Sequence, residues 1–133
     1  MKKVYTKEDA ITEVKRELEV REKFYPRWIA DNKISEERAK RQKLALAEAL
    51  AILEETGPKK QDPKKALKEL RRELKMRMKV YPRWIVDKKL HRDRANKQYL
   101  GLEQALKIIE AKEGIAYNQT TLFPIKNNYD AND

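Results

Sequence analysis

The sequence predicts an all-α protein built from two tandem αα-hairpins. Charged residues make up 41% of the 133 residues and hydrophobic residues 40%, with only three Gly, a composition typical of long helices. When the chain is shifted along itself by 56 residues, 22 of the 44 positions from Ile11 to Glu54 are identical, which indicates an internal duplication. Within each copy, apolar residues recur at the spacing of one helix face.

Each copy is predicted to contain two helices. The apolar face of the first comprises Ile11, Val14, Leu18, Tyr25 and Trp28, matched by Leu67, Leu70, Leu74, Tyr81 and Trp84. The second carries smaller residues, namely Ala39, Leu46, Ala49 and Leu53, matched by Ala95, Leu102, Ala105 and Ile109. We expect these small side chains to let the helices approach closely.

Local signals mark the helix ends. Thr6 followed by Asp9 resembles a capping box, because each residue can accept a hydrogen bond from the backbone N–H of the other. Asp62 stands ahead of Pro63, which places a capping residue before a proline at the first helical position. Gly57 and Gly114 are typical of residues that follow a helix.

The two helices of each copy are joined around the stretch "YPRWI". Because proline disfavours helical geometry in the preceding residue, the first helix is predicted to end or kink at Tyr25 and Tyr81. Pro26 and Pro82 would then open a short new turn of helix. The segments "ADNKIS" and "VDKKLH" would reverse the chain.

The predicted organisation follows from the repeat. Residues 1–56 form the first hairpin, 57–65 a linker, 66–114 the second hairpin and 115–133 a flexible C-terminal tail. We expect the hairpins to pack as a four-helix-type bundle, because neither is expected to be stable alone. The sequence leaves open whether they pack within one chain or swap between two chains, which would give a homodimer.

Composition excludes several classes of protein and site. The absence of Cys excludes disulfides and thiolate metal sites. No apolar run approaches the roughly 18 residues of a membrane-spanning helix. The opening "MKKVYTKEDA" lacks the apolar stretch of a secretory signal. We therefore expect a cytoplasmic protein.

Neither an enzyme nor a cofactor is predicted. The one histidine, His91, aligns with Ser35 at the expected start of a helix, where capping is favoured over acid–base chemistry. The sequence contains no phosphate-binding glycine loop, no His-rich ligand set and no Ser with a plausible base nearby. Acidic residues are interleaved with Lys and Arg, as on an ordinary helix surface.

The formal net charge of +10 is typical of a protein with an acidic partner, most commonly nucleic acid. The charge is uneven along the chain. Residues 7–56 contain 11 Lys and Arg against 12 Asp and Glu, whereas residues 66–113 contain 14 against 7. Any electrostatic footprint is therefore expected on the second half.

A cationic stripe is predicted on this second half, and it comprises Lys64, Lys65, Lys68, Arg71, Arg72, Lys75 and Lys79. Four of its members recur at i, i+4, i+7 and i+11, while Thr12 and Glu19 interrupt the equivalent positions of the first copy. The stripe is either a solvated face or a nucleic-acid contact. Contacts of this kind would be made to phosphates, would be sensitive to salt and would be nearly independent of sequence.

The twin "YPRW" corners combine residue types that stack on bases and bind phosphates. Tyr25 and Trp28 continue the apolar face of their helix, however, which favours packing at the edge of the core. Arg27 and Arg83 are predicted either to pair with the aspartate one turn later or to contact a protein partner.

Arg21 and Arg77 fall where the apolar face would place a hydrophobic residue. We expect each aliphatic stem to cover the core while its guanidinium reaches Glu17 or Glu73, one turn earlier. The presence of both arginines in copies that differ in charge favours a structural role.

The segment from Asn118 to Ile125 is uncharged. Within it, "QTTLF" is similar to the Q-x-x-[LM]-F peptide by which bacterial DNA polymerases and repair proteins dock on the sliding clamp. The resemblance implies that Gln119 forms hydrogen bonds at the rim of a pocket while Leu122 and Phe123 fill an apolar cleft. The alternative is that these side chains fold back onto the helical body.

The repeat "RELxxRxxxYPRWI" and its following helix resemble short uncharacterised proteins of bacteriophage and prophage genomes, over most of residues 11–110. The resemblance implies a phage accessory origin and no assigned activity. Our leading hypothesis is a non-enzymatic accessory protein that binds nucleic acid through its second hairpin and the host sliding clamp through its tail. The alternatives are an inhibitor or adaptor of a host defence or replication factor, with Arg27 and Arg83 at the interface, and a structural component of a phage assembly.

Overall fold

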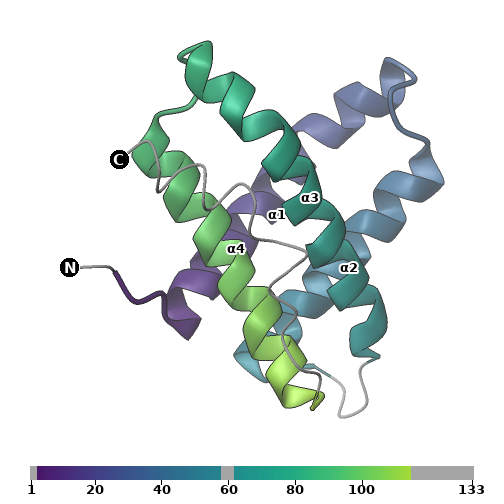
Figure 1. The fold of residues 1–133 in the computed structure, drawn as a ribbon. Coiled ribbons are helices and arrows are strands. Elements are labelled where there is room, and N and C mark those ends of the chain that lie inside the picture. The colour runs from purple at the N-terminus through teal and green to yellow at the C-terminus, as the bar shows by residue number, and fades with distance from the viewer. Residues whose placement is uncertain (1–2, 58–61, 115–133) are drawn as a thin grey trace.

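The protein is described by a computed structural model that covers residues 3–57 and 62–114. Within these ranges the secondary structure is entirely helical (Figure 1), with α1 at Lys7–Ala30, α2 at Glu36–Glu54, α3 at Pro63–Val86 and α4 at Arg92–Lys112. The predicted all-α fold of two tandem hairpins is confirmed. In the part of the chain that the structure describes, no helix has the length and apolar character needed to cross a membrane.

The predicted helix caps are present. The Thr6 hydroxyl accepts a hydrogen bond from the backbone N–H of Asp9, whose carboxylate accepts one from the backbone N–H of Thr6, at 3.2 and 2.9 Å. Asp62 caps α3 by accepting from the backbone N–H of Lys64 at 3.0 Å. His91 caps α4 in the same way, since its Nδ1 accepts from the backbone N–H of Asp93 at 3.2 Å.

Of the two alternatives predicted for the helix corners, an end or a kink, the structure excludes the end. The first helix of each copy does not end at Tyr25 or Tyr81, because α1 continues through Pro26 to Ala30 and α3 continues through Pro82 to Val86. Each proline lies in the last two turns of its helix, so its missing N–H removes one hydrogen bond near an end that is already exposed. The chain then reverses at two equivalent residues in the left-handed region, Asn32 and Lys88, both with a φ of 59°.

The two hairpins cross and are related by a pseudo-two-fold axis. α1 packs against α2 of its own hairpin and against α4 of the other, while α3 packs against α4 and α2 in the equivalent way. Figure 1 shows the crossing, with the two turns at the ends of diverging arms. The buried apolar residues at the crossing come from all four helices and include Val14, Leu46, Leu70, Leu102 and Ile109.

Small residues permit this packing, as the sequence predicts. Ala49 and Ala105 are fully buried at equivalent positions of α2 and α4. Gly101 of α4 lies so close to α1 that a Cβ there would be 3.1 Å from the Cβ of Glu13. The equivalent residue of the first copy is Ala45, so the two halves are not identical at this contact.

A buried set of ion pairs occupies the crossing between α1 and α3. We call it the central network, and it comprises Glu13, Arg16, Glu17, Arg21, Glu69, Arg72, Glu73 and Arg77. Each buried arginine reaches the glutamate one turn earlier at 3.1 Å, as predicted for Arg21 with Glu17 and for Arg77 with Glu73. The number of charges of each sign is equal, so the network has no formal net charge.

Each buried arginine also bridges to the other hairpin, which the sequence does not predict. Arg21 lies 2.8 Å from Glu69 and 3.0 Å from Glu73. Arg77 lies 2.9 Å from Glu13 and 2.8 Å from Glu17. These four contacts join residues more than 45 positions apart in the chain. They hold α1 and α3 together through long side chains.

The remaining donors of the two arginines are satisfied by the second helix of each hairpin. Arg21 donates to the backbone carbonyl of Gln42, and Arg77 to that of Gln98, both at 2.8 Å. The amide oxygens of the same two glutamines accept hydrogen bonds from the hydroxyls of Tyr25 and Tyr81. Burial opposes ionisation of Arg21, but the carboxylates of Glu73, Glu69 and Glu17 raise its pKa above the ordinary value.

Removing one buried arginine should destabilise the fold strongly. We expect Arg77→Met to lower the free energy of unfolding by about 3–5 kcal/mol, because it leaves buried carboxylates without their counter-ion. The matched control is Arg83→Met on the same helix, where the side chain is exposed and forms no ion pair with Asp87. Urea unfolding followed by circular dichroism measures both values. Equal small decreases in the two variants would contradict a structural role for the network.

Candidate binding groove and cationic surface

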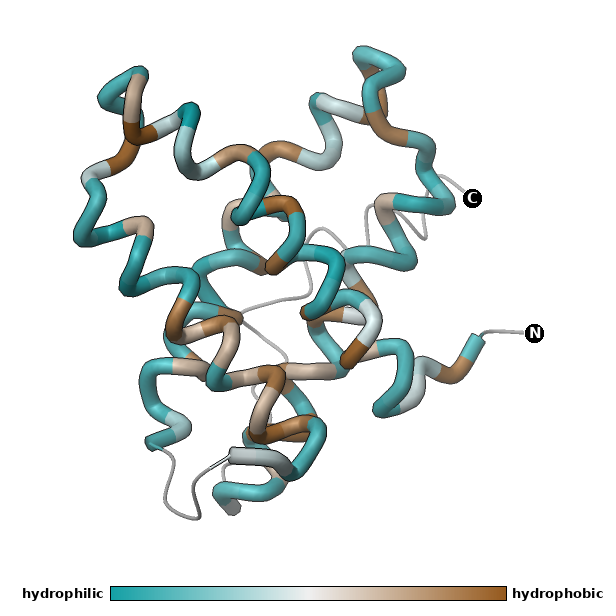
Figure 2. The backbone as a smooth tube through the Cα atoms, turned by 180° about the vertical axis from the view of Figure 1, so that it is seen from behind, coloured by the Kyte–Doolittle hydropathy of each residue, from teal (hydrophilic) through white to brown (hydrophobic). Residues whose placement is uncertain are grey.

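The arms diverge beyond the central network (Figure 2), and side chains of both arms line a groove between them. A cavity of about 570 Å³ lies in the groove on the side of the second hairpin. A second cavity of about 210 Å³ lies on the side of the first hairpin. Both are lined by Glu17, Val20, Trp28, Glu73 and Met76, so together they form one groove astride the pseudo-two-fold axis.

The two cavities are lined by equivalent residues. The larger one is walled by Arg16, Tyr81, Trp84, Lys89, Leu90, Arg94 and Gln98. Their counterparts one repeat away, Arg72, Tyr25, Trp28, Lys33, Ile34, Arg38 and Gln42, wall the smaller one. The groove is therefore a product of the duplication, because each arm contributes the same set of positions.

An apolar stripe runs along each arm on the groove side. On α1 it consists of Val20, Phe24 and Trp28 at i, i+4 and i+8, all of which line the larger cavity. On α3 it consists of Met76 and Trp84 alone, because Val80, the counterpart of Phe24, packs against the core. Trp28, Met76 and Trp84 remain 36%, 38% and 39% exposed. Isolated exposed apolar residues are ordinary, but these three gather in one groove.

The tyrosines of the "YPRW" corners are buried, whereas the tryptophans are partly exposed. Tyr25 and Tyr81 are buried, in agreement with the predicted packing at the core edge. Each tryptophan packs on the tyrosine before it, with ring centroids 5.4 Å apart in the first copy and 5.6 Å in the second. Trp28 and Trp84 keep their outer parts in the groove, so the prediction of core-edge packing describes them only in part.

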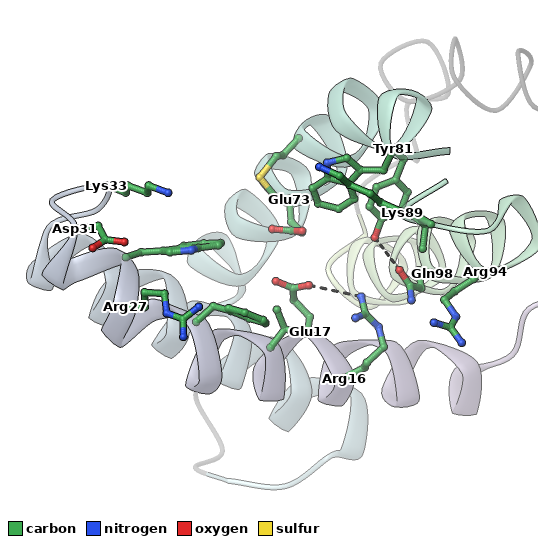
Figure 3. Close-up of a pocket in the computed structure, with 16 residues that line it drawn as sticks. Arg16, Glu17, Arg27, Asp31, Lys33, Glu73, Tyr81, Lys89, Arg94 and Gln98 are labelled. Atoms are coloured by element: carbon green, nitrogen blue, oxygen red, sulfur yellow. Dashed lines mark hydrogen bonds and ion pairs between the residues drawn. The ribbon is translucent and has the colours of Figure 1, made fainter. Parts of the chain in front are cut away.

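Two carboxylates face one another at the base of the groove. Figure 3 shows Glu17 of α1 and Glu73 of α3 pointing toward each other beneath the cavity. Burial, together with the charge of Glu17, raises the pKa of Glu73, although Arg77 and Arg21 act in the opposite direction. Because the neighbouring arginines already neutralise these carboxylates, the base of the groove contributes little net charge.

Cations surround the larger cavity. Arg27 and Lys33 lie on the side of the first arm, and Lys89 and Arg94 on the side of the second (Figure 3). Each of these four side chains is exposed, and none forms an ion pair with another described residue. Among the described residues, Asp31 is the one exposed acidic residue that lines this cavity. The rim of the groove is therefore positively charged.

The exposed charge of the two hairpins differs about as much as their sequence charge does. In residues 7–56 the exposed charged residues are balanced: Lys7, Lys15, Lys23, Arg27, Lys33, Arg38, Lys40 and Arg41 against Glu8, Glu19, Glu22, Asp31, Glu36, Glu37, Glu54 and Glu55. In residues 62–114 they are not: Lys64, Lys65, Lys68, Arg71, Lys75, Lys79, Arg83, Lys88, Lys89, Arg94, Lys97 and Lys112 against Asp62, Asp87, Asp93 and Glu113. The second hairpin therefore has a strongly cationic surface.

The second hairpin withdraws equal numbers of acidic and basic residues from its surface. Glu69 and Glu73 belong to the central network, and Glu103 and Glu110 are also buried, with exposed fractions of 2% and 4%. Arg77 is also buried, and Arg72, Arg92 and Lys107 are half-buried, so the surface keeps the excess of cations that the sequence carries. Glu103 has no acidic counterpart in the first copy, because the equivalent residue is Ala47.

The predicted cationic stripe contains two arginines that form ion pairs and five lysines that do not. Arg72 lies in the central network, 2.6 Å from Glu69, and Arg71 pairs with Glu110 at 2.6 Å. The lysines of the stripe are exposed, and none forms an ion pair with another described residue. These lysines are Lys64, Lys65, Lys68, Lys75 and Lys79. Five of the seven predicted residues are therefore free to contact a ligand.

The remaining predicted site residues have separate positions. Arg27 and Arg83 are both exposed, and no ion pair joins either of them to the aspartate one turn later. The contact with a protein partner, the other alternative, stays a prediction. Arg27 lines the groove, and Arg83 is exposed on the arm of the second hairpin. The predicted clamp-binding residues Gln119, Leu122 and Phe123 lie outside the described residues.

Sequence reasoning missed the groove itself. The signal that could have found it is a second apolar stripe on α1, which Val20, Phe24 and Trp28 form beside the main buried face. Lys33, Lys89 and Arg94 could not be placed at its rim, because their proximity depends on how the two hairpins cross. Among the described residues, no group of three or more His, Cys, Asp or Glu side chains is arranged to hold a metal ion.

In comparisons with known proteins, no family model, no curated protein and no solved structure matches this chain. The candidate functions therefore depend on the groove, the cationic surface and the sequence motifs alone.

Proposed function

We propose that the protein is a non-enzymatic nucleic-acid-binding module whose second hairpin contacts phosphate groups. The observation that carries this proposal is the surface of that hairpin, on which exposed Lys and Arg greatly outnumber exposed Asp and Glu. Surfaces of this kind attract nucleic acid through release of counterions from the phosphate backbone.

The lysines of α3 are the preferred contact residues. Lys68, Lys75 and Lys79 recur on one face of the helix and, at 1.5 Å per residue, extend over about 16 Å. Lys64 and Lys65 continue this surface into the first turn of α3, which carries no acidic residue. Since long flexible lysines bind phosphates as point charges, the proposal implies binding that is sensitive to salt and nearly independent of sequence.

Charge reversal on α3 tests the proposal. Changing Lys68, Lys75 and Lys79 to Glu should weaken binding of duplex DNA and flatten the salt dependence, because each phosphate that is no longer neutralised lowers the log–log slope by about 0.9. Fluorescence anisotropy at several salt concentrations measures both effects.

The matched control reverses the same number of exposed charges on the first hairpin, at Lys23, Lys40 and Arg41. It should retain most of the affinity and the slope. Equal weakening in the two triple variants would show that net charge alone drives binding. A native chain without measurable DNA binding at low salt would refute the proposed function.

The clamp-binding peptide forms the second part of the proposed function. Its support is the sequence "QTTLF" at residues 119–123, which follows the last described helix. A peptide with two large apolar anchors joined to a folded body is a common docking arrangement. Together with the phage-like repeat, it favours an accessory protein that acts at replicating DNA.

Replacing both anchors should abolish this interaction. We expect Leu122→Ala with Phe123→Ala to eliminate binding of the full chain to a purified bacterial sliding clamp, while the thermal unfolding curve stays unchanged. Thr120→Ala with Thr121→Ala, at the positions between the anchors and Gln119, should leave clamp binding within about threefold of the native value. If the Leu122 and Phe123 variant instead binds the clamp normally and unfolds at a lower temperature, the tail packs on its own body.

A further inference from the structure

We propose that the groove between the two arms docks an acidic amphipathic helix of another protein. This inference is independent of the proposed nucleic-acid contact, because the groove rim and the lysine face of α3 share none of the residues on which the two arguments depend. Its support comes from three features of the groove: its apolar stripes, its cationic rim and its helical walls.

The apolar stripes are only partly covered by the described residues, since Trp28, Met76 and Trp84 remain exposed. Val20, Phe24 and Trp28 of α1 have the i, i+4 and i+8 spacing by which a helix normally packs against another helix, and Met76 and Trp84 of α3 occupy the first and last of the equivalent positions. In a parallel-sided bundle the two stripes would cover each other, but the crossing at the central network separates them. A third helix laid between the arms would complete the packing. Each stripe extends about 12 Å, which corresponds to a little over two helical turns.

The rim selects for negative charge. Arg27, Lys33, Lys89 and Arg94 surround the larger cavity, and Arg38 lines the smaller one. A partner helix with Leu, Phe or Met on one face and Asp or Glu along its flanks would cover the stripes and complement these cations. Complementary charges of this kind raise association rates and exclude basic partners.

The floor of the groove favours a protein over a nucleic acid. Val20, Met76 and Leu90 offer aliphatic and thioether surface on which bases do not stack, although Trp28 and Trp84 could each stack on one. Methionine and aromatic residues are enriched at protein interfaces and adapt to the shape of an apolar partner. The described residues contain no strand, so an extended peptide would find no sheet edge there to pair with.

The two tryptophans make the groove directly observable. Trp28 and Trp84 are the only tryptophans of the chain, and both line the larger cavity. A ligand that covers them should shift their fluorescence emission to shorter wavelength, because it removes water from the indole rings. A ligand seated in this groove would contact both indole rings, so the signal reports on the groove most directly.

Three synthetic peptides without tryptophan serve as probes. Each has about 14 residues, roughly four helical turns. The first places Leu and Phe on one helical face and Glu on the others, the second scrambles the same composition, and the third replaces Glu by Lys. We expect only the first to produce a saturable blue shift of tryptophan emission in the full chain, with an affinity that falls as salt is added.

A rim variant and its control locate the binding site. Arg94→Glu should weaken binding of the acidic amphipathic peptide at least about threefold, because it reverses a charge at the rim. Lys97→Glu, an exposed position on the same helix that does not line either cavity, should not. Circular dichroism establishes that both variants remain folded.

Several results would overturn the proposal. These are the absence of a shift with the acidic amphipathic peptide, equal binding of the scrambled peptide, and equal weakening by Arg94→Glu and Lys97→Glu. Quenching of the tryptophans by oligo(dT), without a response to any peptide, would assign the groove to single-stranded nucleic acid instead.

Discussion

Two buried arginines, one from each copy of the repeat, hold the hairpins together at their crossing. Arg21 and Arg77 have exposed fractions of 1% and 0%, and burying an unpaired charge to this extent costs several kcal/mol. Each guanidinium is surrounded by three carboxylates and a backbone carbonyl, and two of those carboxylates belong to the other hairpin. Apolar residues of the same size would stabilise a range of crossing geometries. The directional contacts of arginine fix one.

The candidate groove follows from this crossing. Because α1 and α3 are joined through long side chains, their arms diverge beyond the network and leave the stripes of Val20 and Met76 uncovered. The crossing also brings cations of both arms to the rim of this groove. The lysine-rich face of α3 has a different origin, since the sequence of the second copy already carries the excess of Lys and Arg. The duplication therefore provides both the internal symmetry of the core and the two matched walls of the groove.

Local features could be predicted from the sequence, whereas features that depend on the crossing could not. The caps at Thr6 and Asp62, the capping role of His91 and the pairing of Arg21 with Glu17 all join residues within four positions of each other. The spacing of Arg72 matches that of the exposed lysines, and the sequence does not indicate that Glu69, three positions earlier, is buried and holds Arg72 in an ion pair. The helix continues past Pro26 because a missing hydrogen bond near a helix end costs little. The rule that proline breaks a helix does not account for this dependence on position.

The central claim is that the buried network sets the angle at which the arms cross, and the distance between the arm tips measures this directly. The chain has no Cys, so Ala30→Cys and Val86→Cys, at equivalent exposed ends of α1 and α3, allow two spin labels to be placed without competing sites. Pulsed electron resonance should give one narrow distance distribution in the otherwise native chain. A charge-balanced variant, with Arg21 and Arg77 changed to Met and Glu17 and Glu73 to Gln, should give a broadened or shifted distribution while remaining helical. The same narrow distribution in both proteins would contradict the account.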